Sequence, residues 1–178
     1  TRSSSALRMA QPSAGSASGV LPNPVGYNRV YVHLDEELTW QRWWAGLRAG
    51  RSFVTNGPLL LARANGSLPG QIFRTSAEAP LRIDLQATVL GNDPVEGIEI
   101  VWNGEVIRRT TGPDLRGDPQ FESLTLGESG WFLVRAIARI PFDTLSFAST
   151  APFYVEVGAE TRAIQPHAVE YMLRWAAE

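Results

Sequence analysis

The chain has 178 residues, of which 44% are hydrophobic and 19% charged, a balance that is typical of a folded globular domain and not of a disordered segment. The formal net charge is −2, so the sequence does not favour nucleic acid as a partner. The lack of cysteine excludes disulfides and thiolate zinc sites, and no apolar run reaches the roughly 20 residues of a membrane-spanning helix.

Composition divides the chain into four parts. Residues 1–25 are rich in Ser, Ala, Gly and Pro and lack apolar periodicity, which predicts a flexible linker or tail. Because the chain starts inside this tract and without an initiator methionine, we expect a processed product or a piece of a longer protein. We then predict a strand–helix–strand unit over residues 26–66, a β-sandwich over 67–158 and a C-terminal helix within 159–178. The compartment is left open by the sequence.

A strand and an amphipathic helix are predicted first. Apolar and polar side chains alternate over residues 28–34, which predicts a strand with one face toward a core. The helix follows because large apolar residues recur at i, i+3, i+4 and i+7 and therefore share one face: Trp40, Trp43, Trp44 and Leu47. We expect the hydroxyl of Thr39 to cap this helix and Gly50 to end it in a left-handed conformation.

The three tryptophans are the most demanding feature of this helix. A packed tryptophan buries on the order of 150–250 Å², so the face needs a large partner surface. We predict that Trp40, Trp43 and Trp44 lie in the core or at a domain interface, and we favour this over a ligand platform.

The rest of the chain up to residue 158 carries strand and turn signals. Short strands are predicted over residues 52–55 and 59–64, separated by a turn in which Gly57 supplies a positive φ. From residue 81 the alternation has a period of two, and Asn103-Gly104 predicts a type I′ hairpin. Strands are predicted over residues 81–89, 97–102, 105–110, 121–126, 131–140, 145–148 and 153–157.

These signals define a fold class. About seven short strands with regularly spaced turns are typical of an immunoglobulin-like antiparallel β-sandwich. We therefore predict a mainly β fold with flanking helices, in which Trp102 is a core tryptophan of a central strand. Pro166 suits the first position of the C-terminal helix, whose apolar face we expect to pack on the sandwich or on the first helix. That face consists of Val169, Met172, Leu173 and Ala176.

No arrangement of residues predicts catalysis by this chain. A metal site needs three or four convergent ligands, so we interpret His33, with Asp35 beside it, as a half-exposed strand histidine. His167 is interpreted as a surface residue. The sequence has no G-x-S-x-G nucleophile elbow, and the tract at residues 15–19 lacks the Gly-Lys-Ser/Thr ending of a phosphate loop. We predict no catalytic residue, no metal ligand and no cofactor in this chain.

Several stretches together resemble a known family. Residues 26–34 read GYNRVYVHL, and residues 40–60 follow the pattern W-x-x-W-W-x-G-L-R-A-G-R-S-F-V-T-N-G-P-L-L. They are followed by N-G-x-x-P-G at residues 65–70, by G-W-F-x-V-R at 130–135 and by F-A-S-T-A-P-F-Y-V at 147–155. These residues resemble the C-terminal part of the carbaryl-hydrolase-like (CehA/McbA) branch of the polymerase-and-histidinol-phosphatase metallohydrolases. The resemblance runs over residues 15–157.

The resemblance implies a metal-dependent hydrolase whose catalytic αβ barrel lies mainly N-terminal to this chain. Most metal ligands of that family belong to histidine- and aspartate-containing motifs upstream, and the last motif begins Gly-Ser-Asp shortly before the strand that matches residues 28–34. The matching residues here are Gly15, Ser16 and Ala17, so the aspartate position holds an alanine, and no histidine follows it closely. No residue of this chain is therefore expected to be a metal ligand, and a divalent metal is expected only in the parent protein.

Three interpretations follow. The first is a non-catalytic accessory domain that packs on or positions an upstream barrel of the same parent chain, or that associates with itself through the tryptophan face. The second is a part of an active metal-dependent phosphoesterase or hydrolase, in which metal-bound water is the nucleophile. The third is a stand-alone β-sandwich that binds carbohydrate or protein.

Candidate cleft or interface residues are, besides the three tryptophans, Asn28, Arg29, His33, Arg51, Thr55 and Asn56. For Asn56 and its turn, a purely conformational role is an equal alternative.

Overall fold

The computed structural model describes residues 12–16, 25–112, 115–138, 145–159 and 166–176. In these ranges the chain forms eleven strands and two helices. In chain order they are β1 (Arg29–Val32), α1 (Trp40–Arg48), β2 (Ser52–Thr55), β3 (Leu59–Ala64), β4 (Ile72–Thr75), β5 (Leu81–Leu90), β6 (Val95–Trp102), β7 (Glu105–Thr110), β8 (Gln120–Leu126), β9 (Gly130–Ala138), β10 (Ser146–Thr150), β11 (Phe153–Val157) and α2 (Pro166–Ala176).

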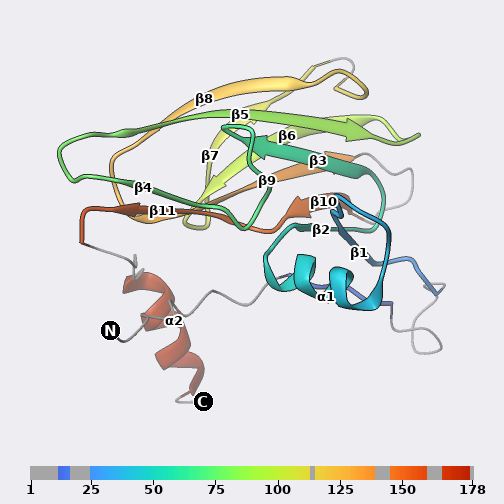
Figure 1. Ribbon diagram of the computed structural model, residues 1–178, viewed down its shortest axis with the longest axis horizontal. Helices are drawn as coiled ribbons and strands as arrows, with labels where there is room; N and C mark the ends of the chain where they lie inside the picture. The colour runs from blue at the N-terminus through green and yellow to red at the C-terminus, as the bar shows by residue number, and fades with distance from the viewer. Residues whose placement is uncertain (1–11, 17–24, 113–114, 139–144, 160–165, 177–178) are drawn as a thin grey trace.

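The strands form two facing sheets (Figure 1). The large sheet has eight strands in the order β1-β2-β10-β9-β11-β4, and β6 and β7 continue it from the other edge of β9. The small sheet has the order β3-β5-β8. The predicted class, an immunoglobulin-like β-sandwich with flanking helices, is confirmed by this arrangement.

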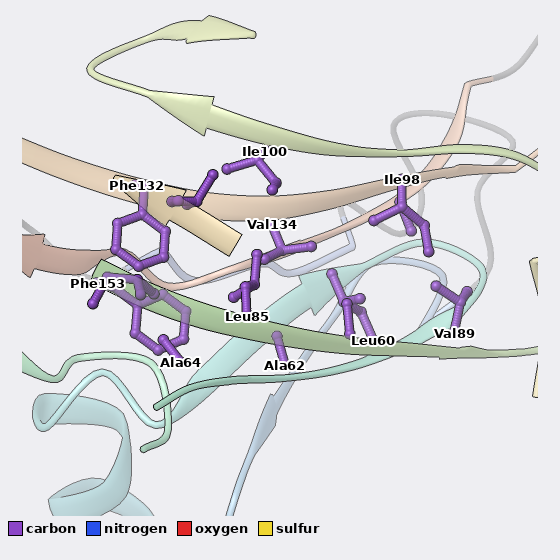
Figure 2. Close-up of a cluster of buried hydrophobic side chains, with 14 of the residues drawn as sticks. Leu60, Ala62, Ala64, Leu85, Val89, Ile98, Ile100, Phe132, Val134 and Phe153 are labelled. Carbon is purple, nitrogen blue, oxygen red and sulfur yellow. The ribbon is translucent and has the colours of Figure 1, made fainter. Parts of the chain in front are cut away.

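The core fills the space between the sheets. Figure 2 shows the rings of Phe132 and Phe153 together at one end of the drawn cluster, and their centroids are 4.9 Å apart with nearly parallel planes. Every second residue of the long strands points inward, as the period-two alternation predicts. The inward residues include Leu60, Ala62, Ala64, Leu85, Val89, Ile98, Ile100 and Val134.

The strand–helix–strand unit is present and belongs to the sandwich. Strands β1 and β2 are antiparallel neighbours at one edge of the large sheet, while β3 is an edge strand of the small sheet. Helix α1 packs closely on β1, because a Cβ on Gly46 would lie 2.5 Å from Cγ1 of Val32. The origin of this unit in an upstream barrel stays a prediction.

The predicted ends of α1 are confirmed. The backbone N–H of Arg42 donates to the hydroxyl of Thr39 over 3.3 Å, and Gly50 has a φ of +75°. The Asn103-Gly104 hairpin is confirmed by positive φ angles at both residues, between β6 and β7.

The predicted backbone conformation of Gly57 is wrong. Gly57 does not have the positive φ that we predicted, and a Cβ there would instead overlap the hydroxyl of the buried Ser146. Close approach, and not backbone conformation, therefore requires glycine at this turn.

Two more features of the sheets differ from what the sequence led us to expect. The short strand β4 was not predicted, and it pairs with β11 in parallel although the sandwich is otherwise antiparallel among the described strands. Trp102 lies at the end of β6 and is half-buried at the edge of the core.

The predicted packing of the C-terminal helix is wrong for its described side chains. Residues 169–176 of α2 are all exposed, and the helix projects away from the sandwich (Figure 1). The side chain of His167 lies outside the described residues. Neither described helix has the length and apolarity needed to cross a membrane.

Candidate functional site

A groove of about 460 Å³ is lined by residues of β1, β2 and β3. Helix α1 lies beside β1 and β2 (Figure 1) and contributes no residue to the lining. Its lining comes from the end of β1 and the following residues 33–34, from residues 51–53, from residues 59–63 of β3 and from residues 68–69. Alternate residues of β5 and one residue of β10 complete the lining. The groove therefore collects residues from six segments, four of them within residues 31–69.

Aromatic and aliphatic side chains make up much of the lining. The antiparallel pairing of β1 and β2 sets Tyr31 opposite Phe53, and their rings stack with centroids 5.1 Å apart and planes 10° from parallel. Tyr31 is also partly exposed, whereas Phe53 packs against the core. Leu59, Leu61 and Leu90 add aliphatic surface from the small sheet.

The ionisable side chains that line the groove, apart from Tyr31, are all basic: His33, Arg51 and Arg63. Asp35 lies just outside the lining, with its carboxylate oxygens 3.3 Å from Nη1 of Arg51 and 3.1 Å from Nε2 of His33. Arg63 has no carboxylate partner among the described residues, and its Nη1 donates to the carbonyl of Gly66 over 2.9 Å. The local field therefore favours an anion.

Ser52 and Thr150 are the two buried polar residues of the lining. Ser52 is 3% exposed, and its hydroxyl has no hydrogen-bond partner within the described part of the chain. Buried hydroxyls in proteins are nearly always hydrogen-bonded. The hydroxyl oxygen of Ser52 is itself buried, and the alternation of side chains along β2 puts it on the opposite face from the Phe53 ring, so it is not open to a ligand in the groove.

The predicted cleft residues divide into two groups. His33 and Arg51 line the groove, as the cleft hypothesis expects. Thr55 and Asn56 do not line the groove and instead form hydrogen bonds that stabilise the backbone. The hydroxyl of Thr55 donates to the carbonyl of Pro58 over 2.6 Å. The Asn56 amide bridges to strand β10 and the residue before it, donating to the Leu145 carbonyl over 2.7 Å and accepting from the Phe147 N–H over 2.8 Å.

Asn28 and Arg29 lie at the start of β1 and do not line the groove. Asn28 is bonded to the preceding segment, since its N–H donates to the Ser16 hydroxyl over 2.8 Å. Arg29 has a buried Nε without a partner among the described residues. Tyr31, Ser52 and Arg63 were not predicted as site residues, because their contributions depend on pairings between distant segments.

The tryptophans form a second surface on α1, which we call the tryptophan face. The ring of Trp44 lies edge-to-face with those of Trp40 and Trp43, with centroids 5.5 and 5.0 Å away. The guanidinium carbon of Arg48 lies 6.0 Å from the Trp44 centroid. Trp40 is 70% exposed and Trp43 and Trp44 are half-buried, so the part of our prediction that placed the face in the core is wrong for Trp40.

Two further polar features bear on chemistry. No group of three or more His, Cys, Asp or Glu side chains that could hold a metal lies among the residues that the structure describes. Among the described carboxylates, Glu99 is the most buried. It accepts from Nε and Nη2 of Arg135 over 2.8 and 2.6 Å and lies 3.3 Å from Nη1 of Arg109. Both of its oxygens are thus held by arginines, which indicates a structural role.

Comparison with known proteins adds little to this picture. No protein-family model and no curated protein matches the chain. It is similar to the fibronectin(III)-like modules of Clostridium thermocellum CbhA, with 21% identity over 55% of this chain and 46% of that chain and a TM-score of 0.38. A Jonesia denitrificans lytic polysaccharide monooxygenase is 12% identical over 50% of this chain and 61% of that chain, with a TM-score of 0.34. Each match spans less than two thirds of the other chain, and such likeness assigns neither a ligand nor a reaction.

Proposed function

We propose that this chain is a non-catalytic accessory module that packs, through the tryptophan face of helix α1, on an upstream barrel of the same parent protein. The proposal combines the resemblance to carbaryl-hydrolase-like metallohydrolases with one observation, the exposure of Trp40 beside two half-buried tryptophans. Large aromatic rings are the residues that most often dominate protein interfaces.

The local structure suits a docking element. The end of the helix is held in place at Gly46 and Leu47, which are buried, whereas Trp40 at its start is exposed and Trp43 and Trp44 are half-buried. The neighbouring Leu38 is 71% exposed and extends the apolar surface. An interface there costs little side-chain ordering, because the tryptophan rings already fix one another by edge-to-face contacts.

The test is binding between this chain and the separately produced segment that precedes it in the parent protein. We expect Trp40→Ser to weaken that binding at least about tenfold in isothermal titration calorimetry, since removing a central aromatic residue typically costs 2 kcal/mol or more. Phe121→Ser is the matched control, because Phe121 is also 70% exposed but lies on β8. The Phe121→Ser variant should bind the upstream segment as tightly as the unchanged chain does.

Two outcomes would contradict the proposal. The first is no measurable binding of the unchanged chain to the upstream segment. The second is a dimer of this chain in analytical ultracentrifugation that Trp40→Ser dissociates, because a second copy would then occupy the tryptophan face.

A further inference from the structure

We propose that the groove formed by β1, β2 and β3 binds a small organic anion in which an aromatic body is joined to a carboxylate. This site is separate from the tryptophan face, and the proposal does not depend on the accessory role. It rests on two features of the groove: its size and apolar surface, and its charge.

The size of the groove suits a small molecule. Its volume of about 460 Å³ lies within the range of about 300–1,000 Å³ that is usual for small-molecule sites in proteins. Such sites are mostly apolar and carry a few polar groups that fix the orientation of the ligand. The lining here has this composition, with leucines from β3 and β5 and a small number of polar side chains.

Tyr31 provides the aromatic contact. One side of its ring is stacked on Phe53, and this pair is fixed by the register of β1 and β2. Because Tyr31 remains partly exposed where it lines the groove, its ring is open to a second stacking partner. Offset stacking of a planar ligand on a ring that is already held in place needs no rearrangement.

The charges select an anion. Arg51 and Arg63 both line the groove, and the lining contains no aspartate or glutamate. Asp35 balances Arg51, but Arg63 has no carboxylate partner within the described chain and so leaves an excess of positive charge. The planar fork of a guanidinium matches the two oxygens of a carboxylate, which makes this group the best fit.

An uncharged ligand has no comparable gain in this groove. Asp35 already pairs with Arg51, whereas Arg63 would remain without a carboxylate partner within the described chain.

The experiment compares two probes of nearly the same shape, biphenyl-4-carboxylate and the neutral biphenyl-4-methanol, by protein-observed NMR titration of the whole chain. We expect the carboxylate to bind at least about tenfold more tightly, and the shifted amide signals to lie in β1, β2 and β3. Arg63→Gln should weaken binding of the carboxylate about fivefold or more and leave binding of the alcohol unchanged. Inorganic phosphate at the same concentration should not displace the carboxylate, because it lacks an aromatic body.

The control variant is Arg108→Gln. Arg108 is exposed on β7, and its Nη1 donates to a backbone carbonyl over 3.2 Å, as that of Arg63 does over 2.9 Å. Its substitution should change neither affinity. The proposal is overturned if both probes bind equally or not at all, if phosphate displaces the carboxylate, or if the shifted signals lie on helix α1. It is also overturned if Arg63→Gln, shown by its melting temperature to be folded, binds the carboxylate as before.

Discussion

Replacement of Phe132 by alanine should lower the free energy of unfolding by about 3–5 kcal/mol, the usual cost of removing a buried phenylalanine ring. Phe132 has no exposed surface and stacks on Phe153, which is also fully buried. Its strand β9 is the central strand of the large sheet and pairs with β6, β10 and β11. A cavity at this position is therefore surrounded by paired strands that cannot easily collapse into it.

Urea unfolding followed by circular dichroism measures this loss as a lower midpoint at an unchanged slope. A domain of this size has a stability of about 5–15 kcal/mol, so Phe132→Ala can lie close to unfolding. Phe132→Leu, which keeps most of the apolar volume, should be folded and lose less. The control is Phe121→Ala on β8, where the 70% exposed ring should change stability by no more than about 0.5 kcal/mol. Equal losses at the two positions would show that the core is not centred on Phe132.

The strands that were predictable are those that carry their own signals. In β5 the alternation of inward and outward side chains is visible in the sequence, and Ile83, Leu85, Ala87 and Val89 are buried as that alternation predicts. The β6–β7 hairpin was predictable from Asn103-Gly104, because few other dipeptides accept two successive positive φ angles. Local backbone preferences and a period of two were thus sufficient for most of the sandwich.

The parts that were not predictable depend on distant partners. Strand β4 has four residues and is defined by its pairing with β11, about 80 residues later in the chain. Gly57 is required because the Ser146 side chain lies against it, which no local pattern indicates. The exposed face of α2 shows the opposite error, since an apolar stripe predicts burial only where a partner surface is present.

The candidate site shows the same division. His33 and Arg51 were predicted as cleft residues because they would lie near the end of the barrel implied by the family resemblance, and the structure places both in the lining of the groove. Arg63 and Ser52 carried no signal of a site in the sequence. An arginine in a short strand is usually a surface residue, and a serine there is usually an ordinary small strand residue. Only the meeting of β1, β2 and β3 makes them neighbours in one groove.

Gly70→Ala is the second substitution with a large expected effect, a loss of about 3 kcal/mol or more. Gly70 has a φ of +86°, and a Cβ there would overlap the carbonyl oxygen of Ala49 and lie 2.8 Å from its carbonyl carbon. A left-handed alanine costs roughly 1–2 kcal/mol, and forced overlap with the backbone at the end of α1 adds about 1–3 kcal/mol. The N–H of Gly70 also donates to the carbonyl of Pro152 over 2.9 Å, a bond that any displacement would strain.

Gly66→Ala is the control that separates these two causes. Gly66 also has a positive φ, +75°, but a Cβ there would meet nothing within 4 Å, so we expect a loss of about 1 kcal/mol from backbone conformation alone. If both variants lose the same free energy of unfolding in urea, the close contact between Gly70 and the end of α1 does not contribute.

Because Leu68 and Pro69 line the groove directly before Gly70, displacement by Gly70→Ala should also weaken binding of biphenyl-4-carboxylate. Gly66→Ala, which leaves that contact intact, should bind the probe as the unchanged chain does.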